Sequence, residues 1–228
     1  MKLFVIEGVD GAGKSTQIKM LNDFFTEKGF NCEYLHFPRT SAPYFGELIA
    51  RFLRGEFGTL NEVNPYLVAM LYAGDRKDAA ATINNWLNEG KVVLLDRYTY
   101  SNIAYQCAKL DSKESRDELM NWILALEFDH FAIPKPDLNI FLDVPFSFTE
   151  KKLSDARTGD DRIYLNGNRD IHEEDLPFQK TVRDIYFNVS QVDNRLAMVN
   201  CCSSEGSILS PKEIFSIILR LLTDRKLI

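Results

Sequence analysis

Short runs of apolar, often β-branched residues recur along the chain, and longer amphipathic stretches separate them. The runs are continuous rather than alternating, which is typical of strands that are covered on both faces. Each run ends in a polar or glycine-containing turn. This pattern predicts an α/β fold with a five-stranded parallel sheet. The predicted strands are KLFVIE (2–7), CEYLHF (32–37), KVVLLD (91–96), LNIFLDV (138–144) and RLAMVN (195–200).

The amphipathic stretches predict helices on both faces of this sheet, and therefore a three-layer α/β/α arrangement. The first predicted helix ends at Gly29, and in the last one Ser210 and Pro211 are typical of an N-cap and a first turn. The predicted helices span 13–29, 64–90, 115–128 and 210–222.

The segment 154–175 departs from this alternation, because it is polar, is rich in Gly, Asp and Arg, and lacks an apolar period. It is predicted to be exposed and mobile rather than part of the core. The rest of the chain shows no internal repeat and no low-complexity linker. We therefore expect residues 1–228 to form a single domain.

Charge and cysteine usage narrow the class of protein. A net charge of −6 argues against non-specific binding of nucleic acid, which requires a basic surface. The four cysteines, Cys32, Cys107, Cys201 and Cys202, contain no CxxC pair. The apolar run at the N-terminus is interrupted by Glu7 and is too short for a signal peptide, and no run is long enough to span a membrane. A soluble, cytoplasmic protein is expected.

The stretch GVDGAGKS (8–15) fits the pattern GxxxxGK[ST], directly after a predicted strand and at the start of a predicted helix. In such a loop the backbone N–H groups and the helix N-terminus bind phosphate. Lys14 then neutralises the terminal phosphates of a nucleoside triphosphate, and the Ser15 hydroxyl binds Mg²⁺. The residues predicted to bind the donor nucleotide are Gly8, Gly11, Ala12, Gly13, Lys14, Ser15 and Thr16.

Loops of this kind serve switches, motors and kinases, so the remaining motifs must decide between them. No NKxD sequence, which reads guanine in switches, follows the loop. Asp96 ends a predicted strand and is followed by Arg97 rather than by the Glu that activates water in many ATPases. Asp96 is instead a candidate for holding Mg²⁺ through water. These features favour a kinase.

Arginines at turns and strand ends predict a second phosphate site. They are Arg39, Arg76, Arg97, Arg157 and Arg162. Transfer of a phosphoryl group to another phosphate brings two polyanions together, and several forked guanidinium groups suit that task.

Two of these arginines also have structural alternatives. Arg76 would then be a helix-surface residue paired with Asp75, and Arg97 would complete an ion pair with its neighbour Asp96.

Several motifs together resemble the thymidylate kinase family. They are EGVDGAGKST, FPR, LYAGDR, DRYTYSNIAYQ and KPDLNIFLDV, in that order. The resemblance is specific from Met1 to about residue 145 and looser beyond, through ARTGDDRIY and FQKTVRDIY. It implies a nucleoside monophosphate kinase fold with a lid at about 154–175. It also implies transfer of the γ-phosphate of ATP, with Mg²⁺, to dTMP, and a homodimer.

The resemblance also assigns roles to individual residues. Asp10 would lie at the sugar and phosphate end of dTMP, and Arg39, Arg76 and Arg97 around its phosphate. Lys14, Asp10, Arg97 and the lid residues Arg157 and Arg162 would be catalytic, and Ser15 with Asp96 would hold the metal. The residues expected to contact dTMP are Asp10, Phe37, Arg39, Tyr72, Arg76, Arg97, Asn102, Tyr105 and Gln106.

The family has two arrangements, one with an arginine in the phosphate loop and one with it in the lid. Gly11 takes the place of that loop arginine here, so the chain resembles the second, bacterial type. Glu173 falls near an acidic family position, and the adenine pocket is expected near Asn200 and Cys201. The chain departs from the family pattern at Tyr72, where phenylalanine is usual, at Cys107, where glycine is common, and in a longer lid stretch, YLNGNRDIH.

Two other functions compete with this interpretation. One is a kinase of the same fold that acts on dUMP, dCMP or a nucleoside 5′-hydroxyl. A nucleoside kinase would need a carboxylate base and few arginines, so the arginines favour a monophosphate acceptor. The other is a nucleotide-binding protein without turnover, against which Lys14, Ser15, Asp96 and the lid arginines argue.

Overall fold

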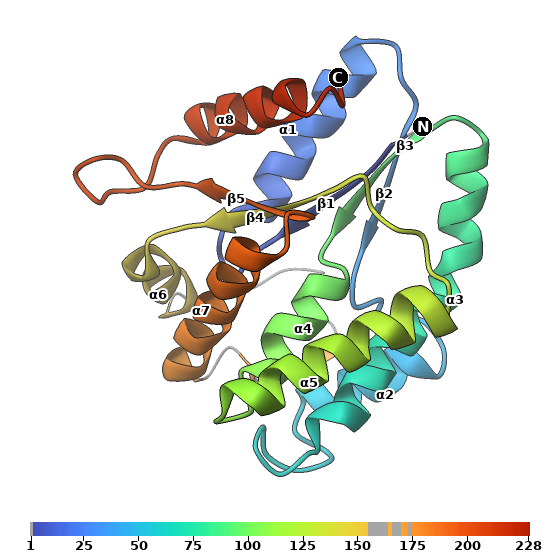
Figure 1. Cartoon of the computed structure of the whole chain (residues 1–228), viewed down its shortest axis with the longest axis vertical. Coiled ribbons are helices and arrows are strands. Elements are labelled where there is room, and N and C mark those ends of the chain that lie inside the picture. The colour runs from blue at the N-terminus through green and yellow to red at the C-terminus, as the bar shows by residue number, and fades with distance from the viewer. Residues whose placement is uncertain (1, 155–163, 166–169, 173–174) are drawn as a thin grey trace.

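The computed structural model describes residues 2–154, 164–165, 170–172 and 175–228. Five strands form one parallel sheet in the order β2-β3-β1-β4-β5, which confirms the predicted fold class (Figure 1). The strands are β1 (Lys2–Glu7), β2 (Cys32–His36), β3 (Val92–Asp96), β4 (Leu138–Asp143) and β5 (Leu196–Asn200).

Burial along the strands explains why their hydrophobicity is continuous. Every residue of β3 and β4 is buried, because helices cover both faces of the sheet there. The edge strand β2 is less covered, and Tyr34 and His36 are exposed on it. The other edge strand, β5, also has exposed positions.

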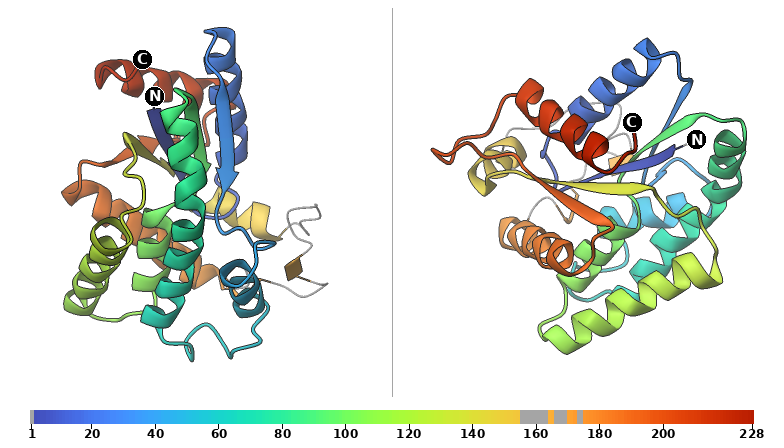
Figure 2. Two further views of the ribbon diagram at one scale, coloured as in Figure 1. Left: turned by 90° about the vertical axis from the view of Figure 1, so that its right-hand side faces the viewer. Right: turned by 45° about the horizontal axis from the view of Figure 1, so that its top comes forward.

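The helices form two outer layers (Figures 1 and 2). On one face α1 and α8 pack together. On the other face α3 and α7 lie against the sheet, α4 packs between these two helices, α2 packs on α3 and α5 packs on α4. A π-helical turn, η1, follows α5 directly. The helices are α1 (Lys14–Glu27), α2 (Phe45–Leu53), α3 (Pro65–Asn88), α4 (Thr99–Cys107), α5 (Lys113–Leu124), η1 (Ala125–His130), α6 (Phe146–Ser154), α7 (Leu176–Val192) and α8 (Pro211–Asp224).

The predicted helices at 13–29, 64–90 and 210–222 correspond to α1, α3 and α8, and their caps fit the sequence. The Asn64 side chain accepts a hydrogen bond from the N–H of Tyr66 at the start of α3. Ser210 and Glu213 form a capping box at the start of α8. The stretch 115–128 is divided between α5 and η1. Helices α2, α4, α6 and α7 were not predicted from the sequence.

Most of the predicted lid, 154–175, lies outside the described residues. Ser154 is the last residue of α6. Of the described residues beyond it, Leu165, Asp170 and His172 are all buried, so the prediction of an exposed segment is wrong for these three. Among the helices of the described chain, none combines the length and the apolar character needed to span a membrane.

A buried carboxylate joins β1 to the helices beyond it. Glu7, the last residue of β1, is fully buried, and its Oε1 accepts hydrogen bonds from the N–H groups of Tyr98 (3.0 Å) and Ser101 (3.3 Å). These N–H groups belong to the N-cap and first turn of α4. Glu7 therefore caps this helix although it belongs to β1, which is distant in the sequence. Its Oε2 accepts from the hydroxyls of Ser101 and Tyr186. Burial raises the pKa of Glu7, although these hydrogen bonds oppose the shift.

Candidate active site

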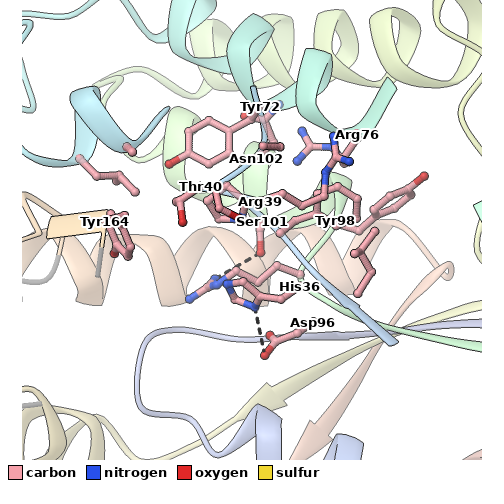
Figure 3. A pocket seen from close by; sticks show the side chains of 18 of the residues that line it. His36, Arg39, Thr40, Tyr72, Arg76, Asp96, Tyr98, Ser101, Asn102 and Tyr164 are labelled. Carbon is pink, nitrogen blue, oxygen red and sulfur yellow. Dashed lines mark hydrogen bonds and ion pairs between the residues drawn. The ribbon is translucent and has the colours of Figure 1, made fainter. Parts of the chain in front are cut away.

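A cavity of about 1050 Å³ opens at the carboxyl ends of β1, β2 and β3 (Figure 3). This is the edge at which parallel α/β sheets bind ligands. Every residue that was predicted to contact the acceptor lines this cavity: Asp10, Phe37, Arg39, Tyr72, Arg76, Arg97, Asn102, Tyr105 and Gln106. The structure therefore brings together positions that are far apart in the sequence, while their roles stay predictions.

The phosphate loop connects β1 to α1 as predicted. Gly13 is the N-cap of α1 and has a φ of 84°, a conformation that costs glycine little. Since Gly13 has no side chain, it cannot cap the N–H groups of the first turn, which are therefore suited to bind an anion. The Lys14 ammonium donates hydrogen bonds to the carbonyls of Gly8 (3.3 Å) and Val9 (3.1 Å). Lys14 thus lies folded against the loop, next to where phosphates would bind.

Asp10, in the middle of the phosphate loop, is held by three side chains from other elements. Arg97 donates to its Oδ1 (2.8 Å), and the Tyr105 hydroxyl donates to its Oδ2 (2.8 Å). Gln179 on α7 also donates to Oδ2 (3.3 Å) and, through the same nitrogen, to the carbonyl of His172 (2.8 Å). The loop, the end of β3, α4 and α7 therefore meet at one carboxylate.

Arg97 is the residue after β3, and its backbone has a left-handed conformation with a φ of 68°. Its guanidinium pairs with Asp10 and also donates to Ser101 (3.2 Å) and Tyr105 (3.1 Å). The alternative in which Arg97 pairs with Asp96 is wrong. Burial alone would lower the pKa of Arg97, but the surrounding oxygen groups more than offset this effect and raise it.

Arg76 lies inside the protein, with an exposed fraction of 1%. Its Nε and Nη2 donate to the two carboxylate oxygens of Glu127, at 2.7 and 2.5 Å. The alternative of a helix-surface residue paired with Asp75 is therefore wrong. Burial works to lower the pKa of Arg76, and the carboxylate of Glu127 outweighs burial and raises it. Glu127 was not among the predicted site residues.

Arg39 is the third of the arginines that were predicted to contact the acceptor, and each of these three is paired with a carboxylate. Its Nε donates to the Oδ1 of Asp75 at 2.8 Å. The three pairs join Arg39 to Asp75, Arg76 to Glu127 and Arg97 to Asp10. Each pair is close to neutral, so it offers an incoming phosphate or base directed N–H groups more than net positive charge.

Asp96, which was predicted to hold Mg²⁺, lies at the end of β3. Its Oδ2 lies 3.4 Å from the Nδ1 of His36, and its buried Oδ1 has no hydrogen-bond partner among the described residues. Burial tends to raise the pKa of Asp96, but Lys14 and His36 lower it overall, so the carboxylate is charged. A charged oxygen that lacks a partner and shares a cavity with Ser15 fits a hard cation such as Mg²⁺.

Aromatic and amide side chains also line the cavity, among them Phe37, Tyr72, Asn102 and Gln106. Phe37 is buried and packs against Tyr98, with ring centroids 5.6 Å apart. Burial raises the pKa of Tyr72, so its hydroxyl is protonated. The buried oxygens of the Asn102 and Gln106 amides have no hydrogen-bond partner among the described residues. This chemistry suits a flat, polar-edged base.

Some predicted positions lie outside the described residues or away from the cavity. Arg157, Arg162 and Glu173 are not described, so the identity of the catalytic lid arginine stays a prediction. Asn200 and Cys201 at the end of β5 do not line the cavity, and their adenine-binding role also stays a prediction.

Within the described part of the segment 154–175, three residues that were not predicted as site residues line the cavity: Tyr164, Asp170 and His172. Tyr164 donates to Asp170 (2.8 Å), and the carbonyl of Tyr164 accepts from Arg54 on the loop after α2 (2.6 Å). These residues belong to a polar stretch with no apolar period, which gave no signal of burial.

Comparison with known proteins gives a consistent result. The family model described as Thymidylate kinase matches residues 6–208. The chain is 34% identical over 185 residues to the thymidylate kinase of Mycobacterium tuberculosis, covering 81% of this chain and 83% of that protein. It is also 34% identical over 209 residues to a probable thymidylate kinase of Pyrococcus horikoshii, covering 90% and 91%. The chain belongs to the thymidylate kinase family. The resemblance inferred from the sequence motifs is thereby confirmed.

A solved structure supports the fold independently. A thymidylate kinase from Candida albicans superimposes with a TM-score of 0.72, at 23% sequence identity, covering 99% of this chain and 92% of that one. The five-stranded parallel sheet flanked by helices is thus the architecture of a thymidylate kinase.

Proposed function

We propose that the protein transfers the γ-phosphoryl group of ATP to dTMP in the cavity described above, to give ADP and dTDP. Membership of the thymidylate kinase family makes the protein a nucleotide kinase. One structural observation supports the assignment of the reaction to this cavity. Asp10, a residue of the phosphate loop, pairs directly with Arg97, a residue predicted to contact dTMP, and this pairing supports a nucleotide donor bound next to the dTMP acceptor.

The donor half of the site is the loop and the start of α1. Backbone N–H groups from Gly8 to Thr16 would bind the phosphates, and Lys14 would move from the loop carbonyls onto the terminal phosphates. Ser15 and Asp96 would hold Mg²⁺, which would neutralise negative charge on the phosphates of the bound nucleotide.

The acceptor half needs no general base, because the phosphate oxygen of dTMP is already anionic. That oxygen attacks the γ-phosphorus, and the bond from this phosphorus to the oxygen of the β-phosphate breaks. Arg39, Arg76 and Arg97 would position dTMP through directed N–H groups, with Asp10 near its sugar. Phe37, Tyr72, Asn102, Tyr105 and Gln106 would surround the base and deoxyribose. Arg157 and Arg162 would approach from the lid, in agreement with a bacterial-type arrangement.

The finer expectations about the state of the protein are also part of this proposal. We infer a single-domain, cytoplasmic enzyme that forms a homodimer. The exposed apolar side chains of Leu67 and Met70 on α3, with exposed fractions of 58% and 44%, are compatible with such an interface.

The experiment that tests the function is a measurement of ADP formation from Mg-ATP with dTMP, dUMP, dCMP, UMP, thymidine or no acceptor. The proposal expects dTMP to give the highest kcat/KM. A lead by another monophosphate or by thymidine would support a same-fold kinase with another acceptor. Nucleotide binding without turnover on any acceptor would support a binding protein. Family membership favours neither alternative.

A further inference from the structure

The strongest unassigned feature next to the cavity is the buried carboxylate of Glu127. It lies in the π-helical turn η1, and no part of its side chain is exposed. Its oxygens accept four hydrogen bonds: from Arg76 at Nε (2.7 Å) and Nη2 (2.5 Å), from the Thr99 hydroxyl (2.7 Å) and from the Asn102 amide (3.0 Å). A carboxylate has about four acceptor positions, so Glu127 is saturated.

These contacts fix the orientation of the Asn102 amide. Its Nδ2 donates one hydrogen to Glu127 and the other to the carbonyl of Ala69, both at 3.0 Å. The amide nitrogen is therefore fully used, and the buried Oδ1 has no partner among the described residues. An amide oxygen can only accept a hydrogen bond. Whatever ligand group meets this oxygen must be a donor.

The same carboxylate aligns Arg76. The bidentate contact uses Nε and Nη2 of Arg76. Nη1 is the nitrogen of the same guanidinium group that does not bind Glu127. Figure 3 shows Arg76 and Asn102 next to one another at one wall of the cavity. Glu127 itself does not line the cavity. Its influence on a ligand must therefore pass through these two side chains.

We propose that Glu127 is a positioning residue that sets the hydrogen-bonding pattern of the acceptor pocket through Asn102 and Arg76, and thereby selects the base of the acceptor. This inference rests on the proposed function, because it requires a nucleotide base in this pocket. Thymine carries a donor at N3, whereas cytosine carries an acceptor at the same position. Asn102 is held with its Oδ1, a hydrogen-bond acceptor, toward the base. The pocket therefore prefers thymine, whose N3 donates a hydrogen bond, to cytosine, whose N3 accepts one.

Glu127→Gln tests this chemistry with little change in shape. It replaces one acceptor oxygen by a donating NH₂ group, which meets the donors of Arg76 or Asn102. Where this NH₂ takes the place of Oε1, the Asn102 amide regains a partner by turning over, which gives up its hydrogen bond to Ala69 and offers its NH₂ to the base. We expect the preference for dTMP over dCMP, as a ratio of kcat/KM, to fall about tenfold. The KM for dTMP rises by a similar factor, while the KM for ATP changes by less than about twofold.

Two further variants separate positioning from general stability. Thr99→Val removes a hydrogen bond to the same carboxylate without touching Arg76 or Asn102. It lowers the melting temperature but leaves the dTMP preference unchanged. In an Asn102→Ala background, Glu127→Gln changes the preference by less than about twofold, because the amide that would meet N3 of the base, and so distinguish thymine from cytosine, is missing. Glu127→Asp, which keeps the charge but moves it back by one methylene, gives the same direction of change if Glu127→Gln does not fold.

The outcomes distinguish this inference from the proposed function. A wild-type enzyme that shows no preference for dTMP contradicts the proposed function. A wild-type preference that survives in Glu127→Gln and Glu127→Asp overturns the role of Glu127 alone. A loss of preference in Thr99→Val equal to that in Glu127→Gln also overturns it, since it would show a general loss of structure.

Discussion

Asp75 on α3 holds Arg39 at three points. Its carboxylate accepts hydrogen bonds from the backbone N–H of Arg39 (2.9 Å) and from Nε (2.8 Å), and its carbonyl accepts from Nη2 (2.8 Å). Asp75 is almost fully buried, with an exposed fraction of 1%. Both the backbone and the guanidinium of Arg39 are therefore fixed before an acceptor arrives, which lowers the entropy cost of binding it.

Asp75→Asn should loosen this arrangement, because an amide offers one acceptor where the carboxylate offers two and places an NH₂ group against the donors of Arg39. We expect kcat/KM for dTMP to fall by about tenfold or more, with little change in the KM for ATP. Steady-state kinetics with each substrate varied would measure both values. The neighbouring exposed Asp78→Asn is the matched control. An equal rise in both KM values would contradict a role limited to the acceptor.

Lys14→Ala should reduce phosphoryl transfer at least ~100-fold, the usual effect of removing a group that stabilises transition-state charge. The assay is ADP formation under saturating dTMP. Lys19→Ala, on the exposed side of the same helix, should keep wild-type activity. If Lys14→Ala turned over at a near-normal rate, the assignment of the phosphate loop would be wrong.

Arg76→Met should destabilise the fold as well as the site, because it leaves Glu127 as an unpaired buried charge. We expect the free energy of unfolding in urea to fall by about 3–5 kcal/mol. The double variant Arg76→Met with Glu127→Gln removes both charges and should recover most of that loss. Simple addition of two large losses in the double variant would show that the pair does not stabilise the protein as a unit.

Asp96→Asn should raise the Mg²⁺ concentration needed for half-maximal activity by about tenfold, because a charged oxygen suited to the ion becomes neutral. Titration of activity with Mg²⁺ at fixed ATP measures the shift, and EDTA should abolish turnover of both proteins. Since His36 contacts Asp96, His36→Gln serves as a control for the lost contact alone. An unchanged Mg²⁺ requirement in Asp96→Asn would remove this residue from the metal site.

Lys109 should make stability depend on pH. Its ammonium lies 4.7 Å from the centroid of the Phe52 ring, without a hydrogen-bond partner among the described residues, and burial lowers its pKa from 10.5 to about 7. Between pH 7 and 10.5 the unfolded chain binds a proton here that the folded chain does not. The contribution of Lys109 to the free energy of unfolding therefore increases as the pH rises from 7 to 10.5, and it is lowest below pH 7.

Lys109→Met removes this dependence. The variant should exceed the wild type in free energy of unfolding at pH 7, and the difference should shrink toward pH 10 by up to about 1.4 kcal/mol per pH unit. Chemical denaturation at several pH values measures it. Lys19→Met, at an exposed position, should show no such trend. A difference that is constant with pH would mean that Lys109 is charged in the folded protein at pH 7.

The sheet could be predicted because its strands have simple environments. β3 and β4 are buried on both faces, so their sequences are continuously apolar. Helix α4 was missed because all nine of its residues are buried, polar ones included, so its sequence does not alternate between an exposed polar face and a buried apolar one. Helix α7 did carry a signal, since Phe178, Val182, Ile185 and Val189 follow a helical period. That period stands next to a polar segment and was not interpreted as a helix.

The residues lining the site could be predicted from motifs, but their pairings could not. Arg39, Arg76 and Arg97 find their carboxylates 36, 51 and 87 positions away in the sequence. Such contacts depend on how the helices pack, which local patterns do not encode. Glu127 left one clue, because it continues the buried positions of Leu119 and Ile123 at four-residue intervals. A charged residue on a buried helical face indicates a specific partner.

The position of Glu7 limits how the chain can change in length. This carboxylate directly precedes Gly8 of the phosphate loop and also caps α4, which carries Asn102 and Tyr105. An insertion between Glu7 and Gly8 would shift the loop relative to α4, and in-line transfer tolerates errors of only about 1 Å. Insertions elsewhere, such as in the hairpin-like turn at 203–207, leave that spacing intact. The junction after β1 is therefore a point at which this enzyme accepts a change in chain length poorly.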